Sequence, residues 1–133
     1  MALEDKTFAL VLEEDQKIAE PISKMLKRRS YGVTVCTREA EALDRIKERT
    51  YPLAVVGHAH GADSPFEAMK EIVMISPMTS MILITDVPDE EVQEKAEGYG
   101  ILGHAQRQDP SKGVLKLVKT FEEIFQSLAP PKK

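Results

Sequence analysis

Two histidines and an aspartate follow a short apolar run in segment 55–63, VVGHAHGAD. Imidazole and carboxylate groups are ligands for Zn²⁺ and related transition metals. Residues i and i+2 of an extended segment point the same way, so His58 and His60 can converge on one ion, with Asp63 three residues further on. The simpler interpretation, which we favour, is a pair of partly solvated loop histidines.

A second group of polar residues follows the apolar run 8–12, FALVL. Glu13 and Glu14 stand directly after this run, and paired carboxylates can hold a divalent cation. The simpler interpretation is again the favoured one: two solvated carboxylates at a strand end, repelled by each other and eased by the charge of Arg107. We therefore expect no metal ion or other cofactor, and keep Glu13, Glu14, His58 and His60 only as weak candidates for metal ligands.

The composition is that of a cytoplasmic globular protein with no membrane or nucleic-acid contacts. The chain of 133 residues has a net charge of -4, is 42% hydrophobic and 30% charged, and scatters its basic residues among acidic ones. No apolar run approaches the ~20 residues of a membrane helix, and the N-terminus is acidic where a signal peptide is basic. The single cysteine, Cys36, excludes an internal disulfide and fits a reducing compartment. We expect one domain over residues 1–129 and a tail or linker stub over 130–133.

Apolar runs of strand length alternate with amphipathic segments of helix length along the whole chain. Ser, Thr and Asp are favourable at the N-terminus of a helix, and Pro is favourable in its first turn. Such residues open the predicted helices after the first, at Thr37, Ser64–Pro65, Asp89 and Asp109–Pro110. The strands are predicted over residues 8–12, 33–36, 53–56, 81–85 and 101–105.

Five consecutive strand–helix units predict a flavodoxin-like (βα)5 α/β domain. This fold is a doubly wound, three-layer sandwich around a five-stranded parallel sheet with strand order 2-1-3-4-5. Ligands of such sheets bind outside the carboxyl ends of the strands. The candidate site is therefore formed by loops 13–15, 57–63, 85–86 and 106–109.

These four loops, in this order, resemble those of the receiver domain of two-component response regulators, and the resemblance covers about residues 7–128. It implies that Glu13 and Glu14 stand at the acidic pair that holds Mg²⁺. It further implies that Thr85 stands at the conserved Thr or Ser position, His104 at an aromatic position, and Arg107 at the position of a lysine.

The resemblance fails at the residue that accepts the phosphoryl group, because Gly57 stands where the family has an aspartate. The chemistry needs a carboxylate nucleophile, a divalent cation and a neutralising lysine. Arg107 keeps the charge but not the compact ammonium group, and Asp86 adds a negative charge where a small residue is usual. Mg²⁺ binding should be weak or absent, because one carboxylate is lost and the other two are longer. The chain therefore resembles an atypical receiver, or pseudo-receiver, with a vestigial phosphorylation pocket at Glu13, Glu14, Gly57, Thr85, Asp86, His104 and Arg107.

Function is then expected to lie in surfaces and not in catalysis. The first hypothesis is a non-enzymatic signalling domain that works independently of phosphorylation, by binding a protein partner or by forming a homodimer. In receivers such contacts commonly use the face formed by the fourth helix, fifth strand and last helix. Side chains of mixed charge would permit a self-complementary contact there. The residues expected on this face are Glu91, Lys95, Tyr99, Lys112 and Lys116.

Two other hypotheses use the pocket itself. One is a sensor of a small ligand or metal, in which Gly57 leaves room and His58, His60 and Arg107 make the contacts. The other is a residual phosphoacceptor, with Asp63 or Asp15 replacing the missing aspartate. A salt bridge from Asp86 to Arg107 is a further expectation, based on charge sign.

Two predictions concern packing. Cys36 is expected to be a buried small hydrophobe on the second strand. Core packing is expected to explain most of the methionines around the third helix and fourth strand, namely Met69, Met74, Met78 and Met81.

Overall fold

The computed structural model of the chain describes residues 7–128, with side chains described as far as residue 125. The predicted end of the domain at residue 129 and the predicted tail 130–133 lie outside the described residues. The five strands form one parallel sheet in the order β2-β1-β3-β4-β5, as predicted. They are β1 (Phe8–Leu12), β2 (Gly32–Cys36), β3 (Leu53–Val56), β4 (Ser80–Ile84) and β5 (Ile101–Ala105).

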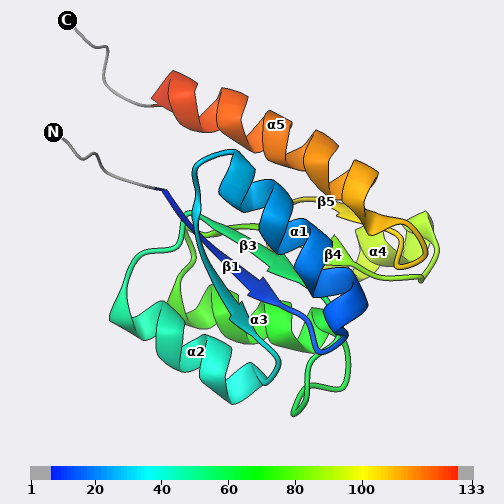
Figure 1. Cartoon of the computed structure of the whole chain (residues 1–133). Coiled ribbons are helices and arrows are strands. Elements are labelled where there is room, and N and C mark those ends of the chain that lie inside the picture. Colours follow the sequence, from blue (N-terminus) through cyan, green and yellow to red (C-terminus); the bar gives the residue numbers. More distant parts are fainter. Residues whose placement is uncertain (1–6, 129–133) are drawn as a thin grey trace, which may run out of the picture.

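Five helices alternate with the strands and cover both faces of the sheet (Figure 1). They are α1 (Gln16–Arg28), α2 (Glu39–Glu48), α3 (Pro65–Ile75), α4 (Asp89–Ala96) and α5 (Pro110–Leu128). Helices α1 and α5 lie side by side on one face, and α2 and α3 lie on the other. Among the described residues, no helix combines the length and apolarity needed to cross a membrane.

The starts of the helices follow the predictions with one exception. The Ser64 side chain accepts a hydrogen bond from the backbone N–H of Glu67, as predicted. At α1, for which no cap was predicted, the Asp15 side chain accepts one from Lys17. The predicted cap at Thr37 is wrong, because α2 begins one residue later, after Arg38, without a side-chain cap. The Thr37 carbonyl instead accepts a hydrogen bond from the His60 backbone N–H at 2.9 Å. The backbone of Thr37 thus pairs with the loop after β3, and the residue lies outside the helix.

The sheet separates two apolar clusters that together form the core. One lies beneath α1 and α5, and the other beneath α2, α3 and α4. Cys36 is buried, as predicted. Met69 and Met81 are also buried, but Met74 and Met78 are 81% and 88% exposed. The prediction that most of the methionines pack in the core is therefore wrong for two of the four.

Candidate functional site

Strand-like hydrogen bonding of β1 continues beyond Leu12 and places Glu13 inside the end of the sheet. The Glu13 backbone N–H donates to the Cys36 carbonyl at 3.0 Å, and that of Glu14 donates to the His58 carbonyl at 2.7 Å. Glu13 is 1% exposed as a consequence, whereas Glu14 points to solvent. The expectation of two solvated carboxylates is therefore correct for Glu14 and wrong for Glu13, which lies between two neighbouring strands.

The buried carboxylate of Glu13 is fully engaged by hydrogen-bond donors. Arg107 binds it in a bidentate manner, with Nη1 2.8 Å from Oε1 and Nη2 2.9 Å from Oε2. The backbone N–H of His58 donates to Oε1 at 3.1 Å, and that of Asp15 donates to Oε2 at 2.9 Å. Hydrogen bonding to Glu13 raises the pKa of Arg107, against the opposing effect of burial. The contact has the bidentate geometry of an arginine–carboxylate pair, the strong form of such a contact.

The Glu13 carboxylate occupies the space in which a side chain at residue 57 would lie. A Cβ built on Gly57 falls 1.9 Å from Glu13 Oε1 and 3.2 Å from Arg107 Nη1. The first distance is far inside van der Waals contact. The expectation that Gly57 leaves an open space is therefore wrong, because the ion pair of Glu13 and Arg107 fills that space.

The loops after β4 and β5 are joined beside this ion pair. The backbone N–H of Arg107 donates to Asp86 Oδ1 at 2.9 Å. The Asp86 side chain thus contacts the backbone of Arg107 and not its guanidinium. The salt bridge expected from the charges is therefore wrong. Thr85 is 3% exposed, and its Oγ1 accepts a hydrogen bond from the Val87 backbone N–H at 3.3 Å.

His58 and His60 lie on a segment whose backbone is hydrogen-bonded to the residues that follow β1 and β2. The backbone of His60 pairs with the residues after β2. Both histidines are exposed, with buried Ala59 between them. His60 Nδ1 lies 3.5 Å from Glu14 Oε1. Within residues 7–128, no three His, Cys, Asp or Glu side chains gather closely enough to hold a metal ion.

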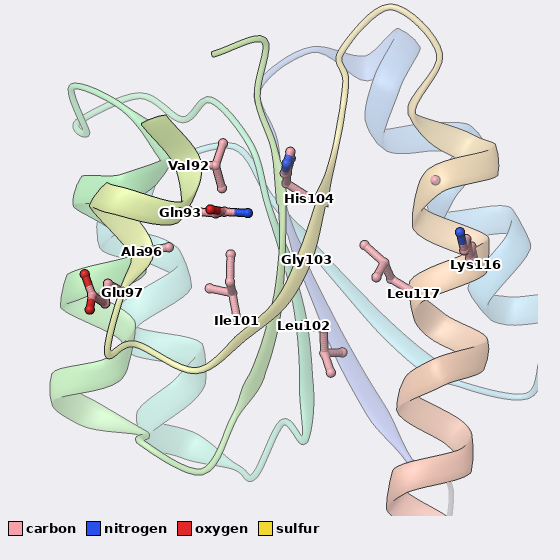
Figure 2. A pocket seen from close by; sticks show the side chains of 11 residues that line it. Val92, Gln93, Ala96, Glu97, Ile101, Leu102, Gly103, His104, Lys116 and Leu117 are labelled. Carbon is pink, nitrogen blue, oxygen red and sulfur yellow. The ribbon is translucent and has the colours of Figure 1, made fainter. Parts of the chain in front are cut away.

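A groove of about 610 Å³ runs along β5 between α4 and α5 (Figure 2). Its apolar lining comes from all three elements and comprises Val92, Ala96, Ile101, Leu102, Gly103 and Leu117. Gln93 on α4 and Glu97, the residue after α4, lie on one side of it, and Lys116 on α5 lies on the other. The groove thus has an apolar floor with an acidic side and a basic side.

His104, within β5, also lines this groove. Its side chain is 19% exposed, and Nε2 lies 3.1 Å from Asp89 Oδ1 in the first turn of α4. Its Nδ1 is buried, with no hydrogen-bond partner. His104 therefore links the floor of the groove to the start of one of its walls.

Of the five residues predicted for the interaction face, only Lys116 lines the groove. Glu91 and Lys95 form an exposed ion pair at 3.0 Å on α4, and Lys112 is exposed on α5. Tyr99 is partly buried against the core. The sequence analysis missed Gln93 and Glu97, although an i, i+4 spacing is that of two residues on one face of a helix. In the structure α4 ends at Ala96, one residue before Glu97.

Comparison with known proteins identifies the fold. No protein-family model and no curated protein matches the sequence. Solved structures do match, including a CheY-like response regulator receiver domain protein from Methanospirillum hungatei JF-1, with a TM-score of 0.78 and 16% identity over 92% of this chain and 99% of that one. The chemotaxis protein CheY4 of Vibrio cholerae matches with a TM-score of 0.76 and 17% identity over 88% and 99%. The BeF3-activated receiver domain of DrrB matches with 0.74 and 22% over 90% and 99%. The chain therefore has the fold of CheY-like receiver domains.

Proposed function

We propose that this protein is a receiver-like signalling domain that works without phosphorylation, as a non-enzymatic module that contacts other proteins. One observation carries the proposal: the Glu13 carboxylate, paired with Arg107, lies where the side chain of residue 57 would be. Gly57 itself offers no nucleophile. The receiver fold supports the signalling role, and the filled space supports independence from phosphate.

The same ion pair argues against a magnesium site. A cation ligand must present free oxygen lone pairs, but both oxygens of Glu13 accept hydrogen bonds from Arg107 and from the backbone. A cation placed there would also face the positive charge of Arg107. We therefore propose that the site holds no cofactor, and that a small ligand has no space beside Gly57.

The test is a titration of the protein with Mg²⁺ and then with beryllofluoride, followed by amide NMR spectra. Intact mass is measured in parallel after incubation with acetyl phosphate. We expect no shifts at residues 13–15, 57–63 or 107, and no gain in mass. The DrrB receiver domain, known in a BeF3-activated form, is the positive control. A mass gain mapped to Asp15 or Asp63 would overturn the proposal and establish a residual phosphoacceptor.

The groove between α4 and α5 supports the interaction role. Its apolar floor gives a partner surface to bury, and Glu97 and Lys116 on opposite sides can select the orientation of that partner. Helix α4 has Asp89, Glu90, Glu91 and Glu94, whereas α5 has Lys112, Lys116 and Lys119. We propose that this face contacts a signalling partner in the cytoplasm, or a second copy of the chain across a twofold axis.

Sedimentation velocity over a range of concentrations tests the second copy. If the face forms a dimer, Lys116→Glu should weaken self-association, because it places like charges opposite the acidic helix of the other copy. Lys47→Glu on α2, outside the groove, is the matched control. If the protein is a monomer at all concentrations, the homodimer is excluded and contact with a different protein is the remaining proposal.

A further inference from the structure

We propose that the Glu13–Arg107 ion pair is also the element that positions the groove between α4 and α5. This inference rests on the proposed function, because it concerns the shape of the same interaction face. The pair lies at the end of the sheet, and Arg107 connects it to all three elements that form the groove. Removing the pair should therefore change the groove, although neither residue lines it.

The first connection runs through the chain itself. Arg107 lies two residues after Ala105, the last residue of β5, and three residues before Pro110, the first of α5. Strand β5 supplies the floor of the groove and α5 supplies one wall. Because the guanidinium is anchored in a bidentate manner, the short connection between floor and wall is held at its midpoint.

The second connection reaches the opposite wall. The backbone N–H of Arg107 is bonded to Asp86, which lies three residues before Asp89 at the start of α4. Asp89 in turn contacts His104 of β5. Three contacts and the short chain segment 86–89 thus link the buried carboxylate of Glu13, through Arg107, to His104 in the groove.

The strength of the anchor comes from its burial. The side chain of Glu13 has 0% exposure and that of Arg107 has 14%. A bidentate pair in such surroundings is little affected by salt, and the loss of one partner leaves an uncompensated buried charge. The ion pair of Glu13 and Arg107 forms without phosphorylation, so we expect the groove to keep one arrangement in the unmodified protein.

The experiment compares Arg107→Met with Arg29→Met by amide NMR and hydrogen exchange. The control breaks another bidentate pair, in which Arg29 Nη2 and Nε lie 2.6 and 3.0 Å from the Glu122 carboxylate, between the end of α1 and α5. We expect Arg107→Met to speed exchange at least about tenfold for amides of Val92, Ile101 and Leu117. Arg29→Met should speed these amides by no more than about fivefold, because its more exposed pair contributes little to stability.

Arg107→Met alone could unfold the protein. The double variant Glu13→Leu with Arg107→Met is therefore measured as well, because apolar replacement of a whole buried pair is often tolerated. The groove amides should again exchange faster. Unchanged groove amides in a folded variant without the pair would overturn the inference, as would an equal change in Arg29→Met. The proposed function fails by a different result. Binding of beryllofluoride to the unaltered protein would contradict it, independently of the exchange rates of the groove amides.

Discussion

Gly57 and Glu13 share a single volume at the end of the sheet. A Cβ at residue 57 would lie 1.9 Å from Glu13 Oε1, so a buried glutamate at 13 requires glycine at 57. The glycine at 57 and the buried glutamate at 13 are therefore one structural solution. The carboxylate of Glu13, directly after β1, fills the space in which a side chain directly after β3 would lie, and its counterion is Arg107 in the loop after β5.

Gly57→Ala should destabilise the protein by about 1–3 kcal/mol, because the added methyl group overlaps the Glu13 carboxylate. The backbone of Gly57 does not have a positive φ, so strain in the main chain adds nothing to this cost. Urea denaturation measures the change. In a Glu13→Ala background the same substitution should cost little, since the obstructing carboxylate is gone. Equal costs in the two backgrounds would contradict the shared volume.

Arg107→Met should lower the free energy of unfolding by about 3–5 kcal/mol, because it leaves the Glu13 carboxylate buried and unpaired. Arg29→Met is the control, because its pair with Glu122 is 33% and 26% exposed and should contribute only about 1 kcal/mol. Adding Glu13→Gln to Arg107→Met should recover part of the loss by removing the stranded charge. Equal losses for the two arginine variants would contradict the burial argument.

The Cys36 thiol should react slowly with Ellman's reagent in the folded protein. Burial raises its pKa from 9.0 to about 11, with a smaller contribution from Glu41. Two units of pKa lower the thiolate fraction by about 100-fold near neutral pH, and burial restricts access further. The reaction of the native protein should therefore be at least about 100-fold slower than that of the protein unfolded in urea. A native rate near the unfolded one would show that the strand opens readily.

The raised pKa of Cys36 also predicts a loss of stability in alkali. The folded state holds the thiol proton more tightly than the unfolded state, so stability is complete below pH 9.0 and falls as the pH rises toward about 11. Denaturation curves at several pH values from 8 to 10 measure this slope. Cys36→Ala should have a shallower slope over the same range, and an unchanged slope would assign the effect to other groups.

Acid should weaken the contact between α1 and α5. The hydrogen bonds from Arg29 lower the pKa of Glu122, helped by the Tyr31 hydroxyl and opposed by burial. A lowered carboxyl pKa contributes stability above the ordinary glutamate range, and that stability is lost as the pH falls through the folded-state value. Stability should therefore decline below about pH 4.5 more steeply in the unaltered protein than in Arg29→Met. If stability falls with pH equally steeply in the two proteins, the Arg29–Glu122 contact does not account for the loss in acid.

The fold was predictable from the sequence because its signals are local. Apolar runs of four or five residues, helix starts such as Ser64 and the alternation of strands and helices lead to a doubly wound sheet without knowledge of distant contacts. The place of Gly57 directly after the third strand was also visible, since it can be counted along the apolar run 53–56. Local signals failed where they competed with neighbouring strands, as at Thr37, whose carbonyl pairs with His60.

The state of the pocket was decided only by the tertiary structure. By composition, a glutamate at a strand end is expected to be solvated, and Glu13 and Glu14 are alike in the sequence. The sheet makes them different: Glu13 is enclosed between β2 and β3, while Glu14 faces solvent. Arg107 is 94 residues from Glu13 along the chain, and the two meet because parallel strands bring their carboxyl ends to the same edge of the sheet. The sequence by itself determined that residue 57 has no side chain, and the packing of distant loops decided that the ion pair of Glu13 and Arg107 fills the space beside it.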